Sequence, residues 1–155
     1  MFSQFSRLIV EADGRYATDA ELAFVKSYLN SAKQRIDAYE SIREAEELIM
    51  DKAEECLEAQ DPQVFMKGTR EVRDICRRDR KSTLRYSAAA MLFNDLDRLK
   101  DSLLLWQRTI VHAVKDEQVS QQTWAVMPEV LREYVDAESV DLMMPALHLT
   151  QALLN

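Results

Sequence analysis

The residues from Asp74 to Tyr86 place a single thiol inside the most basic stretch of an otherwise acidic chain. Cys76 is followed by Asp79 and Arg80, three and four residues later, in the segment DICRRDRKSTLRY. On a helix such spacing puts the three side chains on one face. A carboxylate beside a thiol and guanidiniums would suit a ligand with N–H donors and acidic arms. The same residues also fit an exposed helix with ordinary Arg–Asp pairs, and spacing alone leaves both interpretations open.

The charge of the chain is acidic overall and basic only locally. Its 155 residues include 20 Lys and Arg against 27 Asp and Glu, a net charge of −7. This balance argues against nonspecific binding to nucleic acid or to an anionic membrane, which requires a basic face. Residues 70–81 nevertheless carry more basic than acidic side chains (Arg70, Arg73, Arg77, Arg78, Arg80 and Lys81 against Glu71, Asp74 and Asp79). We therefore expect a small anionic partner rather than a polyanion.

The composition predicts an all-α protein. The chain has only 2 glycines and 3 prolines, and good helix formers make up much of the rest. A chain of this length fits one domain, so we expect residues 1–155 to form a single unit. We see neither a signal peptide nor about 18 consecutive apolar residues, which predicts a cytoplasmic protein without membrane insertion. Its two cysteines are then expected to be free thiols.

The breakers and capping residues predict several helices of unequal length. We expect the first to end near Val10, and the others to cover Asp19 to about Ala59 with a possible break at Asn30–Ser31, Thr69 to Phe93, Leu96 to about Lys115, and two segments beginning near Gln121 and at Asp136–Ser139, with a kink at Pro145. Within the second helix one stripe should face the core, namely Leu48, Ile49, Ala53, Cys56 and Leu57. The glutamates around that stripe, including Glu54, are predicted to form a solvated face.

A family resemblance favours the ligand interpretation. CRRDRKSTLRY resembles the chromophore-bearing helix of phycobiliproteins, C-x-R-D-x-[DG]-Y-Y-x-R, with Cys76, Arg78, Asp79 and Arg85 in register. The segment ADGRYATDAELAFVKSYLNSAKQRI is similar to the amino-terminal GRYLSxxEL segment of that family. YVDAESVDLMMPALHLTQAL is similar to its closing LSAEDA helix. Because these segments follow in the family's order, the resemblance covers nearly the whole chain.

The resemblance implies a globin-like helical fold in which residues 1–30 form an N-terminal helical arm that pairs with a second subunit. It also implies an open-chain tetrapyrrole, a bilin such as phycocyanobilin or a biliverdin-like pigment. Cys76 would be the thioether attachment point, Asp79 would face the inner pyrrole nitrogens, and Arg78 would bind a propionate. Arg73 and Arg80 complete the predicted set of bilin contacts.

Several positions depart from the family pattern. Ser82 and Thr83 replace two aromatic residues, and the segment from Pro62 to Cys76 lacks a loop that helps to cover the pigment, so the pocket should be more open. At the arm, Glu11 stands where an aspartate pairs with the partner's counterpart of Arg85, which implies a homodimer or a complex with a related subunit. These differences favour a bilin carrier similar to the bilin-biosynthesis-associated globins, or a divergent phycobilisome subunit that can sit at the thylakoid surface.

Other functions find less support in the residues. A haem globin needs a proximal histidine, and both His112 and His148 lie in apolar segments where a core or interface role is ordinary. The Glu-x-x-His pairs of di-metal bundles are absent, as are a nucleophile–histidine signature and a phosphate-binding glycine loop, so we expect no enzyme. The remaining alternative is a chromophore-free helical interaction module of the same fold.

Overall fold

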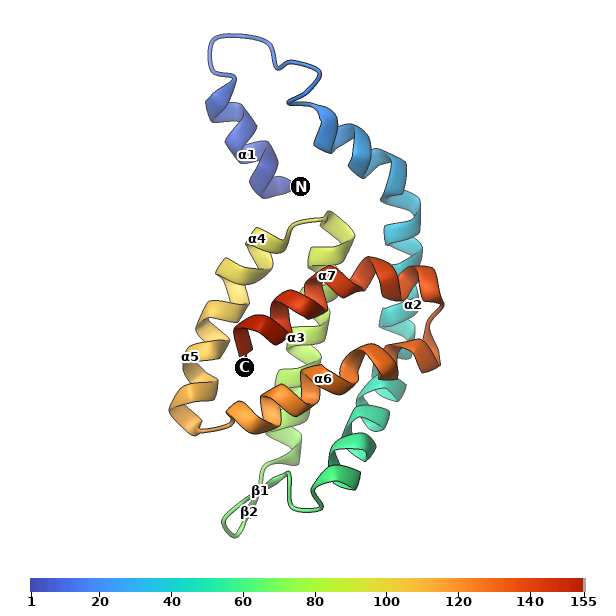
Figure 1. Cartoon of the computed structure of the whole chain (residues 1–155), viewed down its shortest axis with the longest axis vertical. Coiled ribbons are helices and arrows are strands. Elements are labelled where there is room, and N and C mark those ends of the chain that lie inside the picture. Colours follow the sequence, from blue (N-terminus) through green and yellow to red (C-terminus); the bar gives the residue numbers. More distant parts are fainter. Residues whose placement is uncertain (155) are drawn as a thin grey trace.

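The structure, a computed structural model, describes residues 1–154 and confirms the expected all-α, globin-like fold (Figure 1). A short antiparallel hairpin joins the second and third helices. The elements in chain order are α1 (Phe2–Glu11), α2 (Ala23–Gln60), β1 (Met66–Lys67), β2 (Arg70–Glu71), α3 (Arg73–Phe93), α4 (Leu96–Leu99), the π-helical turn η1 (Lys100–Leu104), α5 (Leu105–Val114), α6 (Glu117–Tyr134) and α7 (Ala137–Leu154).

The long helix α2 differs from its prediction at the start and in the middle. The capping contacts come from Thr18 rather than Asp19: the Thr18 N–H donates to Glu21 Oε2 at 2.8 Å, and the Glu21 N–H donates back to Thr18 Oγ1 at 3.3 Å. A turn follows, so the helix proper begins only at Ala23. It then runs without the possible break at Asn30–Ser31, because neither residue prevents helical backbone geometry.

The third helix begins later than expected because a hairpin takes the residues before it. Gly68 occupies the turn with a φ of +62°, a conformation that glycine adopts without strain. On either side of the turn, Lys67 lies opposite Arg70 in the antiparallel register. Behind the hairpin the Val72 N–H donates to the Phe65 carbonyl at 2.8 Å, which closes the loop. The hairpin thus fills the place where the sequence pattern indicated helix from Thr69.

The segment after α3 forms the expected helical run but with a wider turn inside it. Asp95 caps α4 by accepting from the Arg98 N–H at 3.3 Å, and the π-helical turn η1 then leads directly into α5. Lys115 ends α5 in the left-handed region with a φ of +59°. Only two residues separate α5 from α6, which begins at Glu117 rather than near Gln121.

The core lies where α2, α3, α6 and α7 pack on one another. Part of the predicted stripe on α2 points into it: Ile49 and Ala53 are fully buried there and Cys56 packs against it. Leu57 is also fully buried, but in a second cluster with Val64 and Phe65. The prediction that Leu48 is buried is wrong. Its side chain is 55% exposed, because it lies beside the helix face that carries Ile49 and Ala53 and not on it. Within residues 1–154, no helix combines the length and the apolar composition that a membrane span requires.

The N-terminal segment lies largely outside this core. Helix α1 projects from the end of the bundle and is joined to α2 by a long loop (Figure 1). Its amino terminus contacts the corner between α3 and α4, where the Met1 ammonium donates to the Asn94 carbonyl at 2.5 Å. Among residues 1–37, only the Leu8 side chain is buried. This exposure agrees with an arm, while its boundary at residues 1–30 stays a prediction.

Candidate functional site

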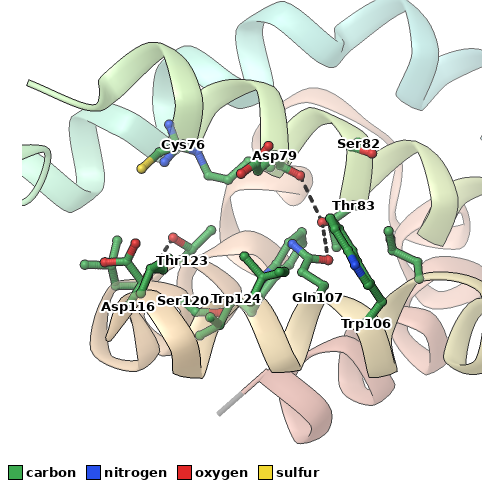
Figure 2. Close-up of a pocket in the computed structure, with 16 residues that line it drawn as sticks. Cys76, Asp79, Ser82, Thr83, Trp106, Gln107, Asp116, Ser120, Thr123 and Trp124 are labelled. Atoms are coloured by element: carbon green, nitrogen blue, oxygen red, sulfur yellow. Dashed lines mark hydrogen bonds between the residues drawn. The ribbon is translucent and has the colours of Figure 1, made fainter.

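A cleft of about 140 Å³ opens between α3, η1–α5 and α6 (Figure 2). One wall comes from α3, the second from η1 and α5, and the third from the start of α6. The lining combines apolar side chains, neutral polar groups and a few charged groups: Cys76, Asp79, Arg80, Ser82, Thr83, Leu103, Trp106, Gln107, Ile110, Val111, Val114, Asp116, Val119, Ser120, Thr123 and Trp124.

The α3 wall brings together three of the predicted site residues. Cys76 is partly buried, the Asp79 side chain is 51% exposed, and Arg80 is buried. The i, i+3, i+4 spacing of these residues therefore places them along one side of the cleft, as expected. Thr83 joins this wall to α5, because its hydroxyl lies 2.9 Å from the Asp79 carbonyl and donates to Gln107 Oε1 at 2.8 Å.

The α5 wall was not predicted as part of a site. Its lining residues recur at helical spacing and form one stripe facing α3 and α6: Leu103, Trp106, Gln107, Ile110, Val111 and Val114. Trp106 remains 64% exposed although it lines the cleft. From the sequence alone, Trp106 is expected to be an anchor of the core or of an interface. The signal that could have identified this wall is the apolar stripe of α5 itself, because α5 carries no buried residue and its stripe is therefore free to line a cleft.

The third wall is the first two turns of α6, and the hairpin closes its end. Asp116, Val119, Ser120, Thr123 and Trp124 line the cleft at helical spacing. The Lys67 ammonium from the hairpin forms an ion pair with the Asp116 carboxylate and lies within 3.5 Å of the Val114 carbonyl. Because that carbonyl belongs to the last turn of α5, the lysine ties the hairpin to the α5–α6 corner.

The cations of α3 lie against a row of carboxylates on α2, and we call this set the ion-pair ladder. Five basic and five acidic side chains form it: Arg73 pairs with Glu54 and Glu58, Arg77 with Glu47, Asp51 and Glu54, Arg80 with Glu54, Lys81 with Glu46 and Glu47, and Arg85 with Glu46. The local excess of positive charge in the sequence is therefore balanced within the chain itself.

Glu54 is the centre of this ladder, and its predicted place on a solvated face is wrong. Its side chain is only 9% exposed and accepts from Arg80 Nη2 at 2.5 Å. Arg77 lies 3.2 Å from the same carboxylate. The Arg80 guanidinium also stacks over the Phe65 ring, with its carbon 5.0 Å from the ring centroid. Burial lowers the pKa of Arg80, and the Glu54 carboxylate opposes that shift.

The remaining predicted residues lie outside the cleft lining. The Arg78 side chain is 76% exposed and its guanidinium pairs with the neighbouring Asp79 at 3.1 Å. Arg73 lies at the hairpin end of the ladder, over the Phe65 ring. The structure thus groups Cys76, Asp79 and Arg80 around the cleft but not Arg73 or Arg78, and the roles of all five as ligand contacts stay predictions.

The Cys76 thiol sits in a setting that favours its protonated form. Burial raises its pKa, while the nearby Arg80 guanidinium acts in the opposite direction. One polar atom beside it is also unsatisfied, because the buried Arg80 Nε has no hydrogen-bond partner within the described part of the chain. The cleft is therefore lined by a partly buried thiol that favours its protonated form and by the buried N–H of Arg80 Nε, rather than by an activated thiolate.

The two histidines lie outside the core, so of the two roles that their apolar segments indicated, core or interface, only the interface role stays a prediction. His148 is exposed, and the His112 ring is 47% exposed with Nδ1 2.9 Å from Glu117 Oε1. Neither residue lines the cleft. Among residues 1–154, no group of three or more His, Cys, Asp or Glu side chains is arranged to hold a metal ion.

The architecture and the site together define an all-α, globin-like protein whose third helix carries a thiol and a carboxylate into a cleft lined by two further helices. Comparison with protein families supports the same class of protein. The profile of the phycobilisome protein family matches residues 7–147, and the chain belongs to this family. No curated protein matches the chain. The predicted phycobiliprotein fold is thereby confirmed.

Proposed function

We propose that this protein binds a bilin in the cleft and acts, without catalysis, as a carrier or biosynthesis-associated protein or as a divergent phycobilisome subunit. The observation that carries the proposal is that Cys76 and Asp79 line one cleft opposite the apolar face of α5. A linear tetrapyrrole presents both chemistries that these walls accept, pyrrole N–H donors and a long apolar π-system. Trp106 supplies a ring to pack on that system, and Asp79 supplies an acceptor for the N–H groups.

The size of the cleft favours carriage over light harvesting. Pockets that enclose a drug-sized ligand measure about 300–1,000 Å³, whereas this one holds about 140 Å³. The residues present would therefore cover only part of a tetrapyrrole and leave the rest in solvent. Ser82 and Thr83 add to this openness, because they line the cleft where the family pattern has aromatic rings. An incompletely covered pigment suits transfer to another protein better than a long-lived excited state.

Cys76 is the proposed attachment point, with reversible binding as the state that precedes it. Adding its S–H across an exocyclic carbon–carbon double bond of a bilin would form one C–S bond and move the proton to the neighbouring carbon. The addition balances without an oxidant or a leaving group. Because burial raises the pKa of Cys76, we expect this addition to be slow and reversible binding to dominate without a lyase.

Co-production with a haem oxygenase and a bilin reductase tests the proposal. We expect a visibly absorbing protein, and zinc-induced fluorescence on a denaturing gel would report the covalent fraction. Cys76→Ala should abolish only that covalent fraction, and Cys56→Ala, the matched control outside the cleft, should change neither signal. A colourless protein would instead favour the chromophore-free interaction module.

Asp79→Asn tests the contact with the pyrrole nitrogens. A hydrogen bond to a charged group contributes about 1.5–3 kcal/mol, so binding should weaken by roughly tenfold or more, and the visible band should shift to the blue. Asp74→Asn is the control, because Asp74 lies on the same helix, is exposed and does not line the cleft. Equal spectra for both variants would remove Asp79 from the site.

Residues 1–30 are further proposed to pair the chain with a second copy or a related subunit, with Glu11 and Arg85 at the interface, in a cytoplasmic setting. Helix α1 exposes Phe5 and Ile9, which are 51% and 61% exposed, and such apolar surface suits a helical partner. Within one chain Arg85 already pairs with Glu46 at 2.6 Å, yet its side chain is 64% exposed. An arm-deleted protein that keeps a dimer mass in light scattering would contradict this pairing.

A further inference from the structure

The charges that face the cleft are already matched inside the protein. Arg80 is the one cationic side chain among the described residues that line it, and its guanidinium is engaged by the buried Glu54 carboxylate. Asp116 contributes a negative charge, which Lys67 balances from outside the lining. The wall formed by α3 adds the half-exposed carboxylate of Asp79. The cleft therefore presents no unpaired positive charge to an incoming ligand. Its one unpartnered cationic N–H among the described residues, the buried Arg80 Nε, belongs to a guanidinium whose charge Glu54 already neutralises.

The cations beside the cleft are also committed. Arg77 contacts Glu47, Asp51 and Glu54 at 2.9, 2.7 and 3.2 Å, so a ligand carboxylate would have to displace acceptors that are already in place. Hydrogen bonds raise the pKa of Arg77, which agrees with a guanidinium satisfied by its own chain. Arg78 is exposed to solvent, where an ion pair with a propionate contributes little.

The other polar groups that line the cleft are neutral. They are hydroxyls and one carboxamide, on Ser82, Thr83, Ser120, Thr123 and Gln107, and they can hydrogen-bond without requiring a charge on the ligand. The chain as a whole carries a net charge of −7, which repels a dianion at long range. Apolar walls, neutral hydroxyls and an acceptor at Asp79 together suit the conjugated core of a tetrapyrrole and not its acidic arms.

We infer that the cleft recognises a bilin by its pyrrole core and leaves both propionates in solvent, so that it does not discriminate between the free acid and a propionate ester. This inference rests on the proposed bilin binding. It assigns specificity to Asp79 and the apolar face of α5, and it gives Arg73, Arg77 and Arg80 a structural role in the ion-pair ladder.

The test compares biliverdin with its dimethyl ester, which has the same conjugated core and no carboxylates. Each compound is titrated into the purified protein while tryptophan emission is followed, because Trp106 and Trp124 both line the cleft. We expect the two dissociation constants to agree within about fivefold, since solvent-exposed ion pairs change affinity little. Arg78→Gln should leave both constants unchanged, and Trp106→Ala should weaken both compounds alike, which shows that the ester binds in the cleft.

The possible results distinguish a failure of this inference from a failure of the proposed bilin binding. An ester that binds more than about fivefold weaker than biliverdin would overturn the inference alone, because the propionates would then contribute to affinity. Weakening of biliverdin, but not of the ester, by Arg78→Gln would overturn it in the same way. If neither compound quenched the emission saturably, the proposed bilin binding would fail and the inference with it.

Discussion

Replacing Glu54 with glutamine should destabilise the fold more than any comparable change on the exposed side of α2. Its carboxylate is 9% exposed and contacts Arg80 at 2.5 Å, and Arg80 itself is 6% exposed. Arg77 has other carboxylate partners, whereas Arg80 has no second one within the described residues. The substitution therefore leaves one buried guanidinium without a counter-charge.

The expected magnitude follows from that orphaned cation. Breaking a buried ion pair from one side costs about 3–5 kcal/mol, and we expect the lower end because the amide oxygen can still accept a hydrogen bond. For a chain of this size 1 kcal/mol corresponds to about 2–4 °C in Tm. Glu54→Gln should therefore lower Tm by roughly 6–12 °C. Urea unfolding followed by far-UV circular dichroism measures the same change as a free energy.

Two further variants decide whether the effect is electrostatic. Glu55→Gln is the matched control on the same helix, because its side chain is 71% exposed, and it should change stability by no more than about 0.5 kcal/mol. The double variant Glu54→Met with Arg80→Met removes both charges and should recover much of the loss. Equal stabilities for Glu54→Gln and Glu55→Gln would refute the central role of Glu54 in the ladder.

Three other predictions concern pH, capping and thiol reactivity. Hydrogen bonds from Lys81, and to a lesser extent from Arg77, lower the pKa of Glu47. The stabilising contribution of Glu47 is therefore complete above about pH 4.5 and is lost as the pH falls further. Urea midpoints that stay constant between about pH 5 and pH 3 would contradict the ion-pair ladder. Asp136→Ala removes the acceptor of the Ser139 N–H at 2.9 Å and should cost about 1 kcal/mol in urea unfolding, a loss that Asp136→Asn should largely avoid. In a variant whose other cysteine is serine, alkylation of Cys76 by iodoacetamide should rise with an inflection above the ordinary pKa of a free thiol, about 8.5, because burial raises the pKa of Cys76. An inflection below that ordinary value would show an activated thiolate instead.

The sequence predicted the fold and one wall of the site because these depend on local patterns. Few glycines, helical periodicity and capping residues locate most helices to within a few residues. The spacing from Cys76 to Asp79 requires only that α3 be helical, so their common face could be predicted. The hairpin was missed because its signal is a single glycine, Gly68, within an otherwise helix-compatible stretch.

The ion-pair ladder and the other walls of the cleft could not be predicted in the same way. Arg80 and Glu54 are 26 residues apart, and their meeting depends on the register in which α2 and α3 pack. Read locally, the basic run indicated an anionic ligand and the glutamates a solvated face, whereas each supplies the counter-charge of the other. The part played by Trp106 likewise depends on how α5 lies beside α3 and α6, which no local pattern encodes.

The most direct test of bilin binding in the cleft is a titration of the purified protein with biliverdin, followed by tryptophan emission and by induced circular dichroism in the visible band. We expect one saturable site, with binding weakened about tenfold by Trp106→Ala and unchanged by Leu105→Ala, because Leu105 is exposed but does not line the cleft. No saturable signal, or equal weakening by both variants, would show that the cleft between α3, α5 and α6 is not where this protein binds a pigment.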